Sequence, residues 1–206
     1  MAYFPFFCEL SQKPGLVIGG GKVAARKIQK LLPYGPHLTV VSPEILPEIR
    51  ALPGVQCLER PFRESDLSGM AFVIAAANDH AVNCRAALLC RDRRIPVNAA
   101  DDEQISSFLF PALVKKGPLS IGISTGGSSP AAAIYLKEQI ASVLPERLDD
   151  ILSYLHETRG AVQAAFPSEE TRRAVSRALF SSCMEVGRPL TPEEQDVLFK
   201  AYGGKA

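Results

Sequence analysis

The stretch that most constrains the fold of this chain is Gly19–Ala24, which reads GGGKVA. It follows the apolar triplet Leu16–Ile18 directly and precedes a segment of helical character, so that Gly19, Gly21 and Ala24 form a G-x-G-x-x-A pattern between a strand and a helix. In that context the first glycine permits a tight turn, the second lets backbone approach a pyrophosphate, and the alanine allows close packing of helix on strand. The pattern predicts a dinucleotide-binding turn, and a simple glycine turn is the alternative.

Short apolar runs alternate with helical stretches over the first two thirds of the chain. Each run is short enough for a strand buried on both faces. Strands that alternate with helices form a parallel sheet through right-handed crossovers. The predicted strands are 16–18, 38–41, 72–76 and 95–97, with a less regular one at 55–58, and the predicted helices include 23–32 and 81–91.

Two further apolar runs, 108–114 and 119–123, are separated only by the sequence KKGP. A parallel crossover needs about a dozen residues or more, so these runs predict an antiparallel pair. Such a pair is an unusual ending for a dinucleotide-binding sheet. We expect it to form an extension that packs on a second subunit.

After residue 124 the chain becomes helical. Ser129 and Pro130 have the form of an N-cap and a first-turn proline, and Pro145 ends the helix that they open. Three more helices are indicated by an apolar stripe over 148–166, a Ser168 cap and a capping box at Thr191.

These elements predict an α/β fold: a Rossmann-like parallel sheet with an antiparallel dimerisation extension and a C-terminal helical segment. The expected domains are an NAD-binding domain over 1–112, a dimerisation segment over 113–145 and a C-terminal helical domain over 146–206.

Composition places the chain among ordinary globular proteins. Of its 206 residues 47% are hydrophobic and 22% charged, and the formal net charge is +1, which gives no overall basic surface for nucleic acid. The longest apolar run, 70–77, is far shorter than the roughly 18 residues of a membrane-spanning helix. We therefore expect a soluble protein with neither nucleic acid nor membrane as a partner.

The cysteines are odd in number and never spaced as C-x-x-C, which argues against a disulfide framework and against a zinc or iron–sulfur site. We expect small buried hydrophobes in a reducing cytoplasm, with a reactive thiol as the alternative. The five residues are Cys8, Cys57, Cys84, Cys90 and Cys183.

The second predicted strand ends in the polar sequence Ser42-Pro43-Glu44. The hydroxyl of Ser42 and the carboxylate of Glu44 can hydrogen-bond a ribose, whereas no arginine stands there to receive a 2′-phosphate. This favours NAD over NADP. A solvated Glu44 at the start of the next helix is the alternative.

Polar clusters follow the last two predicted strands of the sheet, at Asn78–His80 and at Asn98–Asp102. Ligands of open α/β sheets bind beyond the carboxyl ends of the strands, so both clusters are expected to face the same crevice as the glycine turn. Asp101 or Asp102 is a candidate general acid or base. Turn formation, which Asn and Asp favour, is the alternative.

A third signal is the hydroxyl- and glycine-rich loop 124–130, STGGSSP, which leads into a helix. Its amides can receive an anionic group such as a carboxylate. A flexible joint is an equal alternative, because helix capping alone explains its last two residues.

Together these segments resemble the precorrin-2 dehydrogenase/sirohydrochlorin ferrochelatase family, which also forms the N-terminal part of bifunctional sirohaem synthases. Many dehydrogenases share a glycine fingerprint, but its combination with N-x-x-D and ISTGG-S-SP is far more specific. The resemblance spans about residues 3–145. The matching stretches are YFPFF at 3–7 with Leu10, LVIGGGKVAARK at 16–27, LTVV at 38–41, Asn98–Asp101, Ser107-Phe108 and GPLSIGISTGGSSP at 117–130.

The resemblance implies NAD-dependent oxidation of precorrin-2 to sirohydrochlorin and, in many members, insertion of ferrous iron to give sirohaem. It assigns proton transfer to Asp101, and it implies a homodimer with the active site near the interface. The cofactor contacts that we expect are Gly19, Gly21, Lys22, Val23, Ser42, Pro43 and Glu44. The expected substrate contacts are Asn98, Ser124, Thr125, Gly126 and Gly127.

The chain departs from the family pattern after Asp101, where Asp102 and Glu103 replace the small residue or proline that is common there. The added charge either weakens binding of a carboxylate-rich substrate or attracts iron. Two alternatives stay open: a dehydrogenase without chelatase activity, and an NAD(H)-sensing module without chemistry. Because we expect no methyltransferase domain in 206 residues, a separate protein would supply the substrate.

Overall fold

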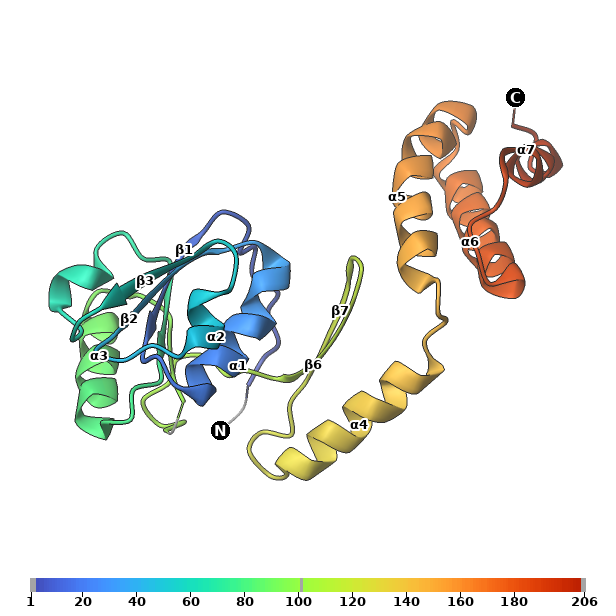
Figure 1. Cartoon of the computed structure of the whole chain (residues 1–206). Helices are drawn as coiled ribbons and strands as arrows, with labels where there is room; N and C mark the ends of the chain where they lie inside the picture. Colours follow the sequence, from blue (N-terminus) through green and yellow to red (C-terminus); the bar gives the residue numbers. More distant parts are fainter. Residues whose placement is uncertain (1–2, 101, 205–206) are drawn as a thin grey trace. The chain divides into compact units, whose positions relative to one another are not determined.

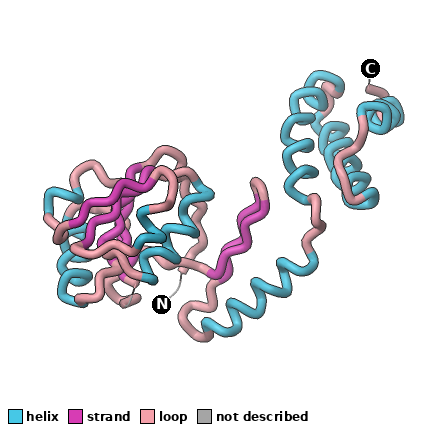
Figure 2. The backbone as a smooth tube through the Cα atoms, in the orientation of Figure 1, coloured by secondary structure: helices cyan, strands magenta, loops and turns pink. Residues whose placement is uncertain are grey.

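The computed structural model of the protein describes residues 3–100 and 102–204. This described chain forms two compact units. The first unit comprises residues 5–110, and the second comprises residues 111–204 together with Tyr3 and Phe4. Figure 2 shows that strands gather in the first unit and that helices dominate the second.

A five-stranded sheet of order β3-β2-β1-β4-β5 forms the centre of the first unit, and every neighbouring pair is parallel. The predicted parallel α/β sheet is therefore confirmed. Its strands are β1 (Pro14–Ile18), β2 (His37–Ser42), β3 (Val55–Glu59), β4 (Phe72–Ala75) and β5 (Val97–Ala99). The α-helices between them are α1 (Lys22–Leu31), α2 (Pro47–Arg50) and α3 (His80–Asp92), labelled in Figure 1.

Helices cover both faces of this sheet because its central strands are apolar on both sides. On one face Val17 of β1 packs with Ala24 and Ile28 of α1. On the other face Leu16 of β1 packs with Ala86 of α3. All five side chains have no exposed surface. With both faces covered, the carboxyl ends of the strands are the edge at which a ligand can bind.

The last strand lies later in the chain than predicted, since β5 covers Val97–Ala99 and not 95–97. Arg94 has a φ of +58°, and the N–H of Ile95 donates to the Cys90 carbonyl at 2.8 Å. These contacts turn the chain after α3. The apolar run 95–97 therefore begins inside the turn, and β5 begins only at the last residue of that run, Val97.

Phe108 and Phe110, predicted as the start of the antiparallel pair, instead pack against the core of the first unit. The strand β6 (Ala112–Lys116) begins after Pro111, which has no N–H to donate to a ladder. The first half of that predicted strand is therefore wrong. The antiparallel pairing itself, with β7 (Leu119–Ile123), is confirmed.

Three helices of the second unit begin at the predicted caps. Ser129, Ser168 and Thr191 accept first-turn backbone N–H groups at 3.1, 3.4 and 3.3 Å, and Glu194 completes the capping box by accepting from the Thr191 N–H at 2.8 Å. None of the helices in the described parts of the chain is long and apolar enough to cross a membrane. The helices are α4 (Pro130–Val143), α5 (Leu148–Ala165), α6 (Glu169–Val186) and α7 (Pro192–Ala201), of which the last three share one apolar core.

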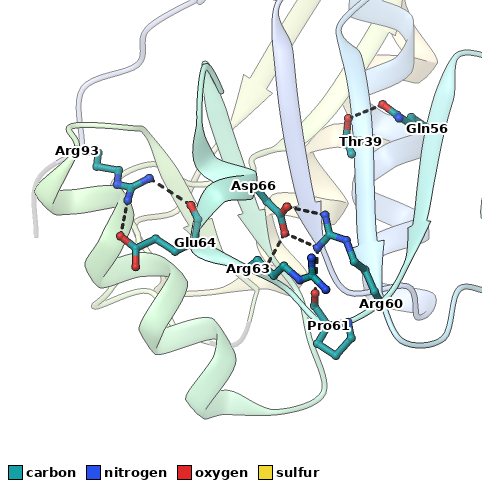
Figure 3. Close-up of polar contacts among 8 residues, drawn as sticks. All are labelled: Thr39, Gln56, Arg60, Pro61, Arg63, Glu64, Asp66 and Arg93. Carbon is teal, nitrogen blue, oxygen red and sulfur yellow. Dashed lines mark hydrogen bonds and ion pairs between the residues drawn. The ribbon is translucent and has the colours of Figure 1, made fainter.

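An ion pair fixes the connection between β3 and β4. The carboxylate of Asp66 accepts from both terminal nitrogens of Arg60, at 2.7 and 2.9 Å, and from the Arg63 N–H at 2.8 Å (Figure 3). Its side chain is only 8% exposed. The hydrogen bond from Arg60 is the main reason that the pKa of Asp66 lies below its ordinary value. Arg93 and Glu64 form a second pair nearby.

We expect Asp66→Asn to lower the free energy of unfolding by about 1–3 kcal/mol at pH 7, because Arg60 loses its charged acceptor. Since the pKa of Asp66 is lowered by folding, this stabilisation is present above the ordinary value of 3.8 and is lost as the pH falls through the lowered value. Urea unfolding of both proteins should therefore converge in acid. Glu59→Gln is the control: its pair with Arg50 is half-exposed, so the expected loss is under about 0.5 kcal/mol. Equal losses in the two variants would contradict this prediction.

Candidate functional site

The glycine turn between β1 and α1 is closely packed at its first two residues. Gly19 has a φ of +116°, and a Cβ atom there would lie 2.2 Å from the Ala76 carbonyl oxygen. A Cβ atom on Gly20 would lie 2.2 Å from the Glu44 carbonyl oxygen. Both positions require glycine because neighbouring backbone occupies the space of a side chain.

Gly21 faces open space instead. The nearest atom to an added Cβ is Asn78 Oδ1, 3.9 Å away. Gly21 is the N-cap of α1, and its carbonyl accepts the first helical hydrogen bond, from the Ala25 N–H at 3.0 Å. The N–H groups of residues 22–24 therefore lie at the positive end of the helix, beside a residue without a side chain. This cradle fits the pyrophosphate of a dinucleotide.

The end of β2 lies beside the glycine turn. The Gly19 N–H donates to the Val41 carbonyl at 2.9 Å, so the two strands are still bonded where the turn begins. Ser42 is half-buried, whereas Pro43 and Glu44 are exposed. The structure thus brings the residues predicted to contact the ribose next to those predicted to contact the phosphates.

Asn98 of β5 is buried, 4% exposed, and its amide is held at both ends. Its Oδ1 accepts from Lys27 Nζ at 2.7 Å, and its Nδ2 donates to the Phe108 carbonyl at 2.9 Å. Burial, with added repulsion from Lys30 and Arg26, lowers the pKa of Lys27 to about 8. Both the oxygen and the nitrogen of the Asn98 side-chain amide thus have partners inside the protein. The contact of Asn98 with substrate stays a prediction.

A serine hydroxyl braces the loop that follows β5. Ser106 Oγ accepts from the Ala99 N–H at 2.9 Å and donates to the Asp102 carbonyl at 2.8 Å. Asp101, the predicted catalytic residue, lies outside the described residues. The role of Asp101 therefore rests on the sequence alone. The structure describes its neighbours Ala100 and Asp102.

The glycine turn and the loop after β5 leave the same edge of the sheet. The Ala76 N–H donates to the Ile18 carbonyl at 2.7 Å, and the Ala100 N–H donates to the Ala75 carbonyl at 2.8 Å. These bonds connect β1, β4 and β5 at their carboxyl ends. The predicted crevice edge is thus formed by neighbouring strands of one sheet.

Two residues of this site were not predicted, namely Lys27 and Ser106. Lys27 adjoins the buried face of α1, beside Ala24 and Ile28. The helical spacing of these residues was therefore a signal that could have indicated a half-buried cation. Ser106 carried only a weak signal, as the first of two serines before Phe108. Its hydrogen bonds depend on the path of the loop, which the sequence does not reveal.

The loop predicted to bind substrate carboxylates is braced by its own hydroxyls. Thr125 Oγ1 donates to the Ser129 carbonyl and accepts from the Ser129 N–H, both at 3.1 Å, and the Gly126 N–H donates to Ser124 Oγ at 3.2 Å. Gly126 and Gly127 have φ values of +61° and +82°. These residues belong to the second unit. The substrate contacts predicted in this loop and the predicted cofactor contacts thus come from different units, whereas Asn98 shares a unit with the cofactor contacts.

All five cysteines are free, as expected. Cys90 and Cys183 are buried, and burial raises the pKa of both thiols, that of Cys90 to about 11. The prediction of burial is wrong for the other three, since Cys8 is exposed and Cys57 and Cys84 are partly exposed. Within residues 3–100 and 102–204 no group of three His, Cys, Asp or Glu side chains is placed to hold a metal ion.

Comparison with known proteins gives matches to both units. Residues 6–112 match a family model described as "Putative NAD(P)-binding", and residues 116–142 match one described as "Sirohaem biosynthesis protein central". Among solved structures, one that is similar to this chain is named SirC, precorrin-2 dehydrogenase, with a TM-score of 0.75 and 25% sequence identity. That similarity covers 98% of this chain and 99% of the other.

Curated relatives are named siroheme synthases. Those of Thioalkalivibrio sulfidiphilus and Escherichia coli are each 36% identical to this chain, over 84% and 87% of its length, and siroheme synthase 3 of Aeromonas hydrophila is 38% identical over 84%. The matches cover only 36%, 40% and 38% of these relatives. Since the NAD(P)-binding match alone covers more than half of the chain and the sirohaem match follows it, the chain belongs to the NAD(P)-binding family of sirohaem biosynthesis proteins that its motifs resemble.

Proposed function

We propose that the protein oxidises precorrin-2 to sirohydrochlorin with NAD as the hydride acceptor. The observation that carries this proposal is the similarity to SirC, named a precorrin-2 dehydrogenase, because it extends over both units and nearly the full length of both chains. The siroheme synthase relatives support the same chemistry over the part of their length that this chain spans.

In this proposal the glycine turn holds the cofactor pyrophosphate. Gly19 supplies the turn, Gly21 leaves the space, and the backbone N–H groups of Lys22 and Val23 receive the phosphate charge. Lys22 is exposed beside this space, so its ammonium adds attraction for the same anion.

Carboxylates near the end of β2 favour NAD over NADP. Ser42 pairs in register with Glu59 of β3, and Glu44 is exposed two residues further along. A 2′-phosphate would be repelled by both carboxylates, whereas a ribose hydroxyl can donate to Glu44 or Ser42. Arg50 is paired with Glu59 at 3.1 Å, which reduces its attraction for a second anion.

The oxidation removes one hydride and one proton from precorrin-2. Nicotinamide, when bound, accepts the hydride, and we assign the proton to the carboxylate of Asp101. Asn98 and the loop from Ser124 to Gly127 are proposed to contact the substrate, the loop through its backbone amides.

A second candidate step is insertion of ferrous iron into sirohydrochlorin to give sirohaem. The resemblance implies this step for many members, and the name siroheme synthase of the relatives supports it. Ferrous iron would then be a substrate. Asp101 is the residue to which we assign help in removing the pyrrole protons.

We also propose a cytoplasmic homodimer in which 1–112 binds NAD, 113–145 forms the dimer contact and 146–206 is a helical domain. Free cysteines fit a reducing compartment. Ala133 of α4 is buried, but Ile134 and Tyr135 are 52% and 61% exposed, and a second copy would cover such apolar side chains. Sedimentation equilibrium at micromolar concentration is expected to give a dimeric mass, and a monomeric mass would contradict the contact.

The proposed function is tested with purified protein, precorrin-2 and either NAD or NADP, followed by ferrous iron. We expect the absorbance spectrum of sirohydrochlorin to appear with NAD, more slowly with NADP, and only when protein is present. A later change to the sirohaem spectrum that needs both protein and iron would establish the second step. Failure to form sirohydrochlorin with either cofactor would refute the proposed function.

A further inference from the structure

Lys27 is a half-buried lysine whose ammonium hydrogen-bonds the side-chain amide of Asn98. Its Nζ lies 2.7 Å from Asn98 Oδ1 and 4.2 Å from the ring centroid of Phe110. In the described part of the chain, no ion pair joins Lys27 to an acidic side chain. Among residues 3–100 and 102–204, the partners of this charge are thus a neutral amide and the face of an aromatic ring.

This arrangement is unfavourable for stability compared with an apolar side chain of equal length. Burial of a charge without an opposite charge is costly, and Arg26 and Lys30 on the same helix add repulsion. Both effects act in the direction of the lowered pKa of Lys27 described above. A methionine would fill the same space against Phe110 without that cost. The ammonium therefore calls for a role beyond packing.

The contacts of Lys27 point to that role because they connect the two halves of the proposed active site. Lys27 belongs to α1, whose first turn forms the phosphate cradle. Asn98 opens the N-x-x-D segment, and its side chain cannot rotate without breaking the bond to Lys27 or the bond to the Phe108 carbonyl.

We propose that Lys27 is a positioning residue of the dehydrogenase, which holds the start of the N-x-x-D segment at a fixed place relative to the cofactor helix. The inference rests on the proposed function. Hydride transfer requires donor and acceptor carbons in contact, and a displacement of about 1 Å can cost about 100-fold in rate. Loss of the Lys27–Asn98 bond should therefore reduce the rate of the chemical step and leave cofactor binding nearly intact.

The test compares Lys27→Met with wild type in precorrin-2 oxidation. We expect kcat to fall by about 10- to 100-fold, while the Kd for NAD stays within about threefold because the glycine turn is unchanged. The melting temperature should change little, because the gain from removing a poorly solvated charge is offset by the loss of the hydrogen bond to the buried Asn98 Oδ1. Lys27→Arg, which keeps the charge and the donor, should recover most of the lost kcat.

Lys30→Met is the matched control, because it removes an exposed ammonium from the same helix and should leave kcat unchanged. Wild-type kcat in Lys27→Met would overturn the inference alone, since the wild type would still be a dehydrogenase. A melting temperature that falls together with kcat, or no rescue by Lys27→Arg, would also overturn it by showing a purely structural role. If wild type itself does not oxidise precorrin-2, the proposed function fails and this inference fails with it.

Discussion

Asp101→Asn is expected to reduce kcat for precorrin-2 oxidation by about 10²- to 10⁴-fold, the range that a positioned general acid or base contributes. An amide cannot accept the proton that leaves the macrocycle as hydride is transferred. The Kd for NAD, measured by fluorescence of the reduced cofactor or by calorimetry, should change by less than about threefold, because the assigned cofactor contacts lie elsewhere in the chain.

The control for this variant is Asp102→Asn, which removes the same charge one residue later. Asp102 is half-buried, and its carboxylate accepts from the Gln104 N–H at 2.8 Å, as in a turn. We therefore expect it to keep most of the activity. If both variants turn over as fast as wild type, a group other than these two carboxylates accepts the proton, and the assignment to Asp101 is contradicted. If wild type binds NAD(H) without turnover, the chain is the sensing module that the sequence also allowed.

Gly21→Val is expected to raise the Kd for NAD by about 100-fold or more, because the new side chain would occupy the phosphate cradle and displace the charge from the helix amides. The fold should survive. An added Cβ meets nothing closer than Asn78 Oδ1 at 3.9 Å, and the φ of Gly21, −91°, suits a residue with a side chain.

Gly19→Ala separates this effect from a loss of folding. Its Cβ would lie 2.2 Å from the Ala76 carbonyl oxygen, at a φ of +116° that alanine rarely adopts, so we expect a lower melting temperature. Circular dichroism should thus show a stable Gly21→Val and a destabilised Gly19→Ala. Wild-type affinity for NAD in Gly21→Val would contradict the assignment of the cradle.

Much of the fold was predictable because its signals are local. The apolar triplet before Gly19 identified β1, and hydroxyl side chains at Ser129, Ser168 and Thr191 identified helix starts, since a cap bonds to residues only three further along. The error at β5 has a local cause too. Ile95 looks like a strand residue, but its N–H is bonded to the end of α3.

The candidate site was less predictable, because its key contacts join residues far apart in the sequence. Lys27 and Asn98 are separated by 71 positions, and no pattern in either segment indicates the other. Phe108 and Phe110 have the composition of a strand, yet they pack against the core that α1 covers. Tertiary packing determines both the Lys27–Asn98 contact and the positions of the two phenylalanines. Residue type alone does not predict such packing.

The most direct test of the central claim is a single-turnover experiment with excess protein, precorrin-2 and NAD, followed by stopped-flow absorbance. If the chain transfers hydride from precorrin-2 to NAD, sirohydrochlorin and reduced cofactor should appear in equal amounts and with the same rate constant. Sirohydrochlorin that forms without reduced cofactor, or no sirohydrochlorin at all, would contradict that claim.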